Sequence, residues 1–272
     1  MKPGGAAKPD RAVKPGGAVT SGGAVKPGRA VKPGGPDLAG IDLVVFDKDG
    51  TLIDFDVMWA GWTIGLAEAL EAAAGTPLAE PLFAAFGFRA DAGRAERGSP
   101  LGSHSMAELR ALAVATVERA GRTPAEAERI VAETWRAPDP VGLAVPLADL
   151  RALFGALRTG GRRIAVATGD DRGPTLATLE VLGVASLVDA IACPDDGHPT
   201  KPDPGMFAHL CATLGVPTAR AAMIGDSTVD LEMARAAGAG LVVGVLSGVG
   251  SREELAPLAD AIVDSVADLE GA

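Results

Sequence analysis

The 272-residue sequence predicts an α/β protein built on a doubly wound parallel sheet, with a helical domain inserted into it. Short apolar runs rich in β-branched residues recur along the chain, and most of them are followed by stretches of helical periodicity. Such alternation is typical of a parallel sheet that helices cover on both faces. Strand signals vanish between residues 56 and 142, so we expect a helical insertion there.

The expected elements follow this alternation in order. The strands are predicted over residues 41–46, 163–167, 187–192, 221–224, 240–245 and, more weakly, 261–263. The helices of the sheet domain are predicted over residues 174–182, 205–214 and 228–237, and those of the insertion over 58–74, 106–120 and 124–135. Two insertion helices begin with capping-box patterns, Ser105 with Glu108 and Thr123 with Glu126, which satisfy free amide groups at a helix start.

The chain therefore divides into three parts: a tail over residues 1–36, a core over 37–56 and 143–272, and a helical insertion over 57–142. The tail holds seven Lys or Arg and one acid, and repeats a unit close to Ala-Val-Lys-Pro-Gly-Gly. Gly and Pro without bulky apolar residues cannot bury enough surface to offset the entropy of ordering, so we expect a disordered basic tail. Composition favours a passive extension over a basic docking arm.

Composition also bounds the class of protein. The formal charge of −10 argues against general nucleic-acid binding. Cys193 and Cys211 are the two cysteines, too few for a disulfide framework, so a reducing cytoplasm is the expected compartment. No apolar run approaches the roughly 18 residues of a membrane span, and no secretory signal is recognisable, so no membrane partner is expected.

The strongest motif follows the first predicted strand. Residues 46–52 read Phe-Asp-Lys-Asp-Gly-Thr-Leu, an apolar strand that ends in two carboxylates, Asp47 and Asp49. Because side chains alternate along an extended segment, both carboxylates can face the same side, and Gly50 lets the backbone turn sharply. Carboxylates at a strand end can bind a hard cation or attack an electrophile.

Polar residues also follow three later strands. Thr168 and Gly169 end the second strand, and both can donate hydrogen bonds to a phosphate oxygen. Lys201 precedes a helix, where it can pair with an anion or remain an ordinary surface lysine. Asp226 ends the fourth strand, and Asp230 lies one helical turn later, where an acid can also simply complement the helix dipole.

With these motifs in order, the chain resembles the haloacid dehalogenase superfamily of phosphohydrolases, with a helical insertion similar to the C1 class of cap and a likeness to phosphoglycolate phosphatases. The resemblance implies that Asp47 is the nucleophile that forms an aspartyl-phosphate and that Asp49 is the general acid and base. It further implies that Thr168, Gly169 and Lys201 bind the substrate phosphate.

The resemblance also implies a Mg²⁺ cofactor. Its ligands would be Asp47, the backbone carbonyl of Asp49, and Asp226, while Asp230 would orient a bound water. The expected activity is hydrolysis of a small phosphomonoester, such as phosphoglycolate or a sugar phosphate. Two alternatives stay open: a phosphosugar mutase, and a non-catalytic module that accepts a phosphoryl group or binds a partner. Asp49 favours phosphoester chemistry, because the family's dehalogenases lack an acid there, and it speaks against the non-catalytic module, because a stable acyl-phosphate needs no hydrolytic base nearby.

The expected substrate is a small phosphorylated metabolite, and the insertion would determine which one is accepted. Its candidates for contact with an anionic leaving group are Arg89, Arg94, Arg97 and His104, although each can be an ordinary surface residue. Its aromatic residues are interpreted as packing core: Trp59, Trp62, Phe83, Phe86 and Phe88. The sequence does not indicate an oligomeric state.

Overall fold

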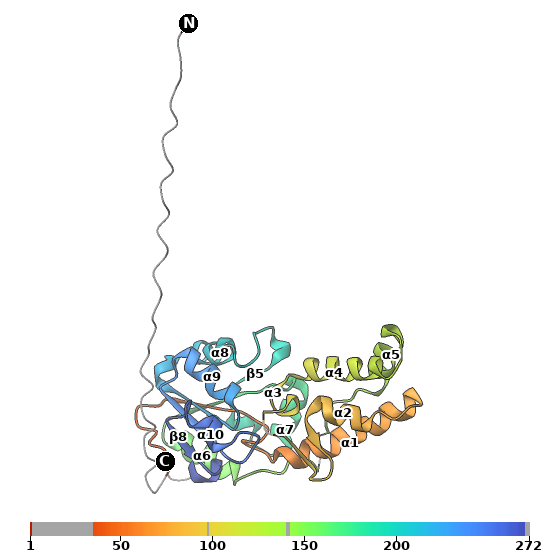
Figure 1. Ribbon diagram of the computed structural model, residues 1–272. Helices are drawn as coiled ribbons and strands as arrows, with labels where there is room; N and C mark the ends of the chain where they lie inside the picture. The colour runs from red at the N-terminus through yellow and green to blue at the C-terminus, as the bar shows by residue number, and fades with distance from the viewer. Residues whose placement is uncertain (2–34, 97, 140–141, 270–272) are drawn as a thin grey trace.

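The computed structural model describes residue 1 and residues 35–96, 98–139 and 142–269. Most of the predicted tail lies outside the described residues, and so does Arg97. Figure 1 shows two lobes side by side, one built on the sheet and one formed by the helices α1 to α5. Each lobe has its own cluster of buried apolar residues, one packed on the sheet and one mainly among the helices of the insertion.

The sheet has six parallel strands in the order β5-β4-β1-β6-β7-β8. The strands are β1 (Leu43–Phe46), β4 (Arg163–Ala167), β5 (Ala190–Ala192), β6 (Ala221–Gly225), β7 (Leu241–Val245) and β8 (Ala261–Val263). Each one overlaps a predicted strand, and β1 lies at the centre, where β-branched residues pack on both faces. The doubly wound α/β fold is confirmed.

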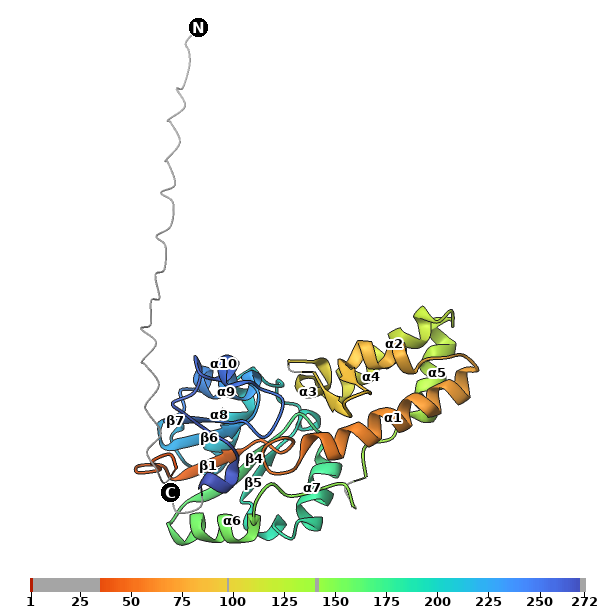
Figure 2. The ribbon, with the colours of Figure 1, turned by 60° about the horizontal axis from the view of Figure 1, so that its bottom comes forward.

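Helices cover both faces of this sheet, as Figure 2 shows from below. α6 (Leu150–Thr159) and α7 (Arg172–Val181) pack against the face that carries Val44 and Phe46. α8 (Gly205–Thr213) and α9 (Thr228–Ala237) pack against the opposite face, and a short helix α10 (Arg252–Leu255) adds to it. Four 3₁₀ turns complete the core: Ala185–Leu187, Pro194–Asp196, Thr218–Arg220 and Val266–Leu269.

The insertion is mainly helical. Its helices are α1 (Phe55–Ala74), α2 (Ala79–Phe86), α3 (Pro100–Ser103), α4 (Met106–Arg119) and α5 (Pro124–Thr134). α4 and α5 begin at the two predicted capping boxes, in which Ser105 and Thr123 each exchange hydrogen bonds with the Glu three residues later. Aromatic side chains fill its interior, and the Trp62 ring packs edge-on against Trp59 and Trp135.

The insertion differs from the purely helical domain that the sequence predicts. A small hairpin joins β2 (Phe88–Arg89) and β3 (Arg94–Ala95), which pair antiparallel. The hairpin escapes a search for alternating residues because each strand has two residues, and its packing comes from a tertiary contact, the edge-on stacking of Phe88 on Phe83. Residues 87–105, which lie outside the predicted helices and strands, thus contain this hairpin and α3.

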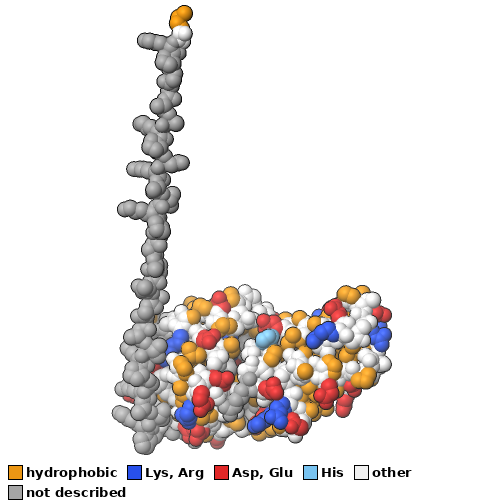
Figure 3. All heavy atoms as spheres, viewed as in Figure 1, with side chains coloured by type: hydrophobic (Ala, Val, Ile, Leu, Met, Phe, Trp, Pro, Cys, Tyr) orange, Lys and Arg blue, Asp and Glu red, His pale blue; other side chains and the backbone are white. Residues whose placement is uncertain are grey.

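The strand register sets the position of the polar residues that follow the strands. Phe46, the last residue of β1, is level with Val166 on one side and Ile224 on the other. The residues that follow β1, β4 and β6 therefore emerge at one edge of the sheet, next to the insertion. On the face drawn in Figure 3, acidic and basic side chains are interspersed over both lobes. No helix within the described ranges is long and apolar enough to cross a membrane.

Candidate active site

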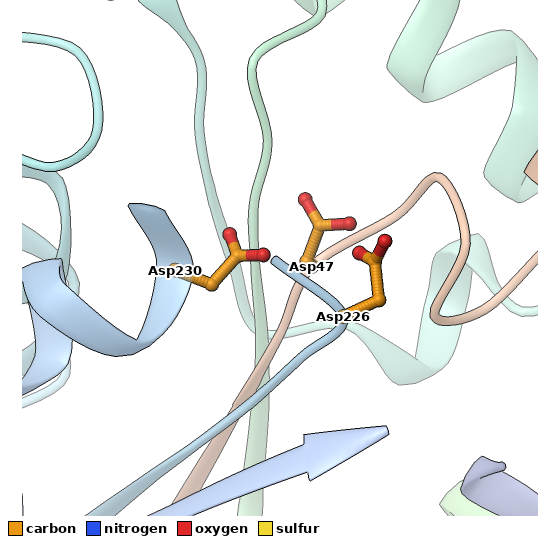
Figure 4. A group of neighbouring side chains, drawn as sticks. All are labelled: Asp47, Asp226 and Asp230. Carbon is orange, nitrogen blue, oxygen red and sulfur yellow. The ribbon is translucent and has the colours of Figure 1, made fainter. Parts of the chain in front are cut away.

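Three carboxylates meet at the carboxyl ends of the central strands. Asp47 directly follows β1, Asp226 directly follows β6, and Asp230 lies in the first turn of α9. One oxygen from each lies within 4.8 Å of the other two, and all three side chains are buried. Figure 4 shows the three carboxyl groups turned toward a shared space.

Asp230 has a structural role as well as a place in this cluster. Ser227 is the N-cap of α9, and its backbone N–H and its hydroxyl both donate to Asp230 Oδ2. This capping box fixes the carboxyl group at the start of the helix and leaves Oδ1 directed at the cluster. Asp230 therefore both caps α9 and belongs to the cluster of carboxyl groups.

Lys201 joins two of the carboxylates. Its Nζ donates to Asp47 Oδ1 at 2.6 Å and also to Asp230 Oδ1. The side chain is 7% exposed, so it is not the solvated surface lysine that its sequence position also allowed. It lies in the segment that leads from β5 to α8.

Burial sets the protonation behaviour of the cluster. It raises the pKa of Asp47 from 3.8 to about 7, although the Lys201 charge opposes this shift. Burial also raises the pKa of Asp226 well above its usual range, and the carboxylates of Asp47 and Asp230 add to the effect. Burial disfavours the Lys201 ammonium, but Asp230 and Asp47 outweigh it, so the pKa of Lys201 lies above its ordinary value.

This donor set fits a divalent cation. Lys201 supplies one positive charge against three buried carboxylates, which leaves negative charge uncompensated. Carboxylate oxygens are the preferred ligands of hard cations, and three oxygens so close together can share one ion. A divalent metal would therefore neutralise a cluster that is costly to keep ionised on its own.

Asp226 is held by the turn that follows β1. Thr51 Oγ1 donates to Asp226 Oδ1 at 3.3 Å, and the Val249 backbone N–H donates to Oδ2 at 2.8 Å. Gly50 lies in this turn with φ of +80°, and a Cβ atom there would come within 2.7 Å of Asp226 Oδ2. The glycine is thus needed both for its backbone conformation and for its close approach to the carboxylate.

Sequence reasoning missed a second charged group beside this cluster. Lys48 is 1% exposed, and its Nζ contacts both carboxylate oxygens of Asp49 and lies 3.4 Å from Asp170 Oδ2. Burial raises the pKa of Asp170 to about 6, against the opposing charge of Lys48. The signal in the sequence was a lysine between the two acids of the first motif and an acid after Gly169.

Thr168 and Gly169 lie at the end of β4 with their polar atoms near this group. The Thr168 hydroxyl accepts from the Asp170 backbone N–H at 3.1 Å, so its own hydrogen remains free to donate. Thr168 is fully buried and borders the cavity at the strand ends. A phosphate oxygen placed above the strand ends could therefore be bound by the hydroxyl.

A cavity of about 60 Å³ lies between the strand ends and the insertion. Its lining contains all seven residues that the motifs predict: Asp47, Asp49, Thr168, Gly169, Lys201, Asp226 and Asp230. The insertion contributes the opposite wall, which includes Phe55, Trp59 and residues 101–106 together with Glu108. Trp59 therefore packs in the insertion core and also borders the cavity, and Glu108 was not among the residues that the sequence singled out.

The sequence candidates for contact with a leaving group lie at two different cavities. His104 lines the cavity at the strand ends. Arg89 and Arg94 instead line a second cavity of about 410 Å³, next to Asp54 and Asp56, and Arg89 pairs with Asp91. Both arginines belong to the hairpin, whose strand β3 contacts α1, and the Ala95 backbone N–H donates to Asp56 Oδ1 at 3.3 Å.

The comparisons with known proteins agree with this geometry. The model of the haloacid dehalogenase-like hydrolases matches residues 41–238, which span β1 to α9 and include every strand-end residue described above. The chain belongs to the haloacid dehalogenase-like hydrolase family. The predicted resemblance is thereby confirmed.

Relatives of this family member carry phosphatase names. The phosphoglycolate phosphatase of Rhodospirillum rubrum is 40% identical over 49% of this chain, and the chain spans about half the length of that relative, 55%. The protein named probable phosphatase IndB of Dickeya dadantii is 32% identical over 85% of this chain and 92% of its own length. A predicted phosphoglycolate phosphatase from Haemophilus somnus has the same fold, with a TM-score of 0.63, 19% identity, and coverage of 86% of this chain and 98% of that one.

Proposed function

We propose that this family member is a Mg²⁺-dependent phosphatase that hydrolyses a small phosphomonoester through an aspartyl-phosphate. The observation that carries the proposal is the cluster of Asp47, Asp226 and Asp230, whose oxygens lie within 4.8 Å of one another with Lys201 bound to two of them. The phosphatase names of the relatives support the same reaction class. The buried free thiols Cys193 and Cys211 suit a reducing compartment such as the cytoplasm.

In the proposed reaction, an Asp47 oxygen forms a bond to phosphorus while the bond from phosphorus to the ester oxygen breaks. Asp49 gives its proton to the departing alkoxide, and later takes a proton from the water that attacks the phosphoryl group and releases inorganic phosphate. Lys201 and the Thr168 hydroxyl would hold the phosphate oxygens in place. Mg²⁺, bound by Asp47, the Asp49 backbone carbonyl, Asp226 and Asp230, would offset the negative charge of the phosphoryl group.

The test is hydrolysis of p-nitrophenyl phosphate by the purified full chain. We expect turnover with Mg²⁺, loss of turnover in EDTA, and a fall of about a thousandfold in Asp47→Asn, because the nucleophile is then missing. Asp42→Asn is the matched control, since Asp42 precedes β1 at its other end and pairs with Arg220 on the surface. Unchanged turnover in Asp47→Asn would refute the assignment of the nucleophile.

The same assay separates the alternatives. A phosphatase releases one inorganic phosphate for each alcohol, whereas a mutase returns the phosphoryl group to a sugar and releases little. A phospho-acceptor module would take up one phosphoryl group per chain and stop. Continuous release of phosphate is the result that the retained Asp49 leads us to expect.

A further inference from the structure

We propose that the insertion wall of the cavity selects phosphate esters whose alcohol carries hydroxyl or ammonium donors over esters whose alcohol carries a carboxylate. The inference rests on the proposed phosphatase function and adds the class of leaving group. A substrate taken from the name of the Rhodospirillum relative, phosphoglycolate, would be of the disfavoured class. The inference comes from the hydrogen-bonding groups of the segment that joins α3 to α4.

This segment lies directly over the strand ends. Ser103, His104, Ser105 and Glu108 all line the cavity that holds Asp47 and Lys201. A Cβ atom at Gly169, at the tip of β4, would lie 3.9 Å from the His104 carbonyl oxygen, so the two lobes nearly touch here. An alcohol that leaves a phosphoryl group bound at the strand ends would therefore meet these residues first.

Glu108 presents an ionised carboxylate to the cavity. Its Oε2 accepts from the Ser105 backbone N–H at 2.7 Å and from the Ser105 hydroxyl at 2.8 Å. These bonds hold the pKa of Glu108 below its usual range. Because both end on Oε2, Oε1 keeps its capacity to accept a hydrogen bond from a ligand.

The neighbouring hydroxyl groups have already used their hydrogens. Ser105 Oγ donates to Glu108, and Ser103 Oγ donates to the Ser99 carbonyl oxygen at 2.9 Å. His104 Nδ1 lies 3.2 Å from Ser103 Oγ, and since that hydroxyl hydrogen is taken, the imidazole donates from Nδ1. The hydrogens of both hydroxyl groups and of Nδ1 are thus already bonded, and Glu108 Oε1 remains as an acceptor in this wall.

The positive charges on the other side of the cavity do not favour a carboxylate on the alcohol either. Lys201 contacts Asp47 and Asp230 and would also bind the phosphate, while Lys48 contacts Asp49 and Asp170, so neither ammonium group is left for a carboxylate on the alcohol. The buried indole N–H of Trp59, which has no partner among the described residues, is enclosed by protein and is not exposed to a ligand. Of the arginines that the sequence nominated, Arg89 and Arg94 line the other cavity, and Arg97 lies outside the described residues, so this balance of charge is that of the described residues alone.

A terminal carboxylate would therefore bring two more acceptors and a negative charge to a wall with an ionised Glu108. A hydroxyl or an ammonium group at the same position would donate to that wall instead. Since Glu108 is exposed at the cavity rim, solvent screens its charge, and we expect a discrimination of about fivefold rather than several orders of magnitude.

The test compares three phosphate esters with a two-carbon chain as competitors of p-nitrophenyl phosphate hydrolysis by the full chain with Mg²⁺. They are 2-hydroxyethyl phosphate, 2-aminoethyl phosphate and phosphoglycolate, which differ in a terminal hydroxyl, ammonium or carboxylate group. We expect an inhibition constant about fivefold lower for the hydroxyl or the ammonium ester than for phosphoglycolate, and their relative order identifies which donor the wall prefers. Equal inhibition by all three, or strongest inhibition by phosphoglycolate, would overturn the inference while leaving the phosphatase proposal intact. Absence of p-nitrophenyl phosphate turnover would overturn both.

The matched variants are Glu108→Gln and Glu126→Gln. Glutamine can replace glutamate in a capping box, so both helices keep their N-terminal hydrogen bonds in these variants. Glu126 is the control because it caps α5 and does not line the cavity. We expect Glu108→Gln to shift the ratio of the inhibition constants about fivefold toward phosphoglycolate, and Glu126→Gln to leave the ratio as in the wild type. An unchanged ratio in Glu108→Gln, or an equal shift in both variants, would contradict the role of Glu108.

Discussion

Lys48 Nζ lies 2.8 Å from Asp49 Oδ1 and 2.7 Å from Asp49 Oδ2, so a buried ammonium group holds one carboxylate by both oxygens. Asp170 Oδ2 completes the group at 3.4 Å. The two acids come from different strand ends, which makes Lys48 the link between the turn after β1 and the turn after β4. Removal of one member of a buried ionic group leaves an uncompensated charge, which costs more than the group contributes as a whole.

Lys48→Met should lower the free energy of unfolding by about 3 kcal/mol at pH 7.5, because Asp49 and Asp170 then face each other without a cation. The loss should be smaller at pH 5, where protonation of a carboxyl group removes one charge. Urea unfolding of the wild type and the variant at both pH values measures this loss in the free energy of unfolding. The double variant Lys48→Met with Asp170→Asn should recover part of the loss at pH 7.5, and equal losses at both pH values would contradict the electrostatic explanation.

Asp170→Asn alone tests the raised pKa of this carboxyl group. Burial raises the folded-state pKa of Asp170 to about 6, above its unfolded value near 3.8, so the folded protein holds the proton more tightly. The stability that this proton provides is complete below pH 4 and is lost as the pH rises through 6. Relative to the wild type, the free energy of unfolding of Asp170→Asn should therefore rise by about 2 kcal/mol between pH 4 and pH 7.5. If the difference in the free energy of unfolding between variant and wild type does not change with pH, the pKa of Asp170 is not raised.

Much of the fold follows from local pattern. Phe46 and Ala167 end apolar runs at which the sequence predicts strand ends, and β6 ends at Gly225, one residue beyond the predicted end; parallel pairing then brings the polar residues behind them to one edge. The capping boxes of Ser105 and Thr123 mark the starts of α4 and α5 to the residue. These features are readable because their physics acts within a few residues of the chain.

Other features depend on contacts that a local pattern does not contain. Alternation along β1 predicts that Lys48 points away from Asp47 and Asp49, but the chain turns at once, with the Leu52 backbone N–H bound to the Lys48 carbonyl, and Lys48 meets Asp49. The placement of Glu108 over the strand ends depends on how the two lobes pack. The β2–β3 hairpin, which diverts Arg89 and Arg94, is likewise fixed by tertiary packing.

Gly50→Ala should be more harmful than the same change at Gly40. Both glycines have φ of +80°, so alanine at either position carries a backbone strain of about 1 kcal/mol. A Cβ at Gly40 meets nothing within 4 Å, whereas at Gly50 it would lie 2.7 Å from Asp226 Oδ2 and 2.9 Å from Gly248 Cα. We expect Gly50→Ala to lose further stability in urea and to require a higher Mg²⁺ concentration for half-maximal turnover. Equal behaviour of the two variants would show that the contact with Asp226 is unimportant.

Asp226→Asn should separate stability from metal binding. Asp226 is 2% exposed with a strongly raised pKa, so its ionised form is costly in the absence of a cation. The amide can replace the carboxylate sterically, since its oxygen can accept from the Val249 N–H while its nitrogen donates to the Thr51 hydroxyl. We therefore expect the melting temperature in EDTA to rise by about 2 to 4 °C, and the increase in melting temperature on addition of Mg²⁺ to shrink or disappear together with turnover. A variant that melts lower in EDTA yet keeps the full Mg²⁺ response would show that Asp226 is a structural residue, and would remove it from the proposed metal site.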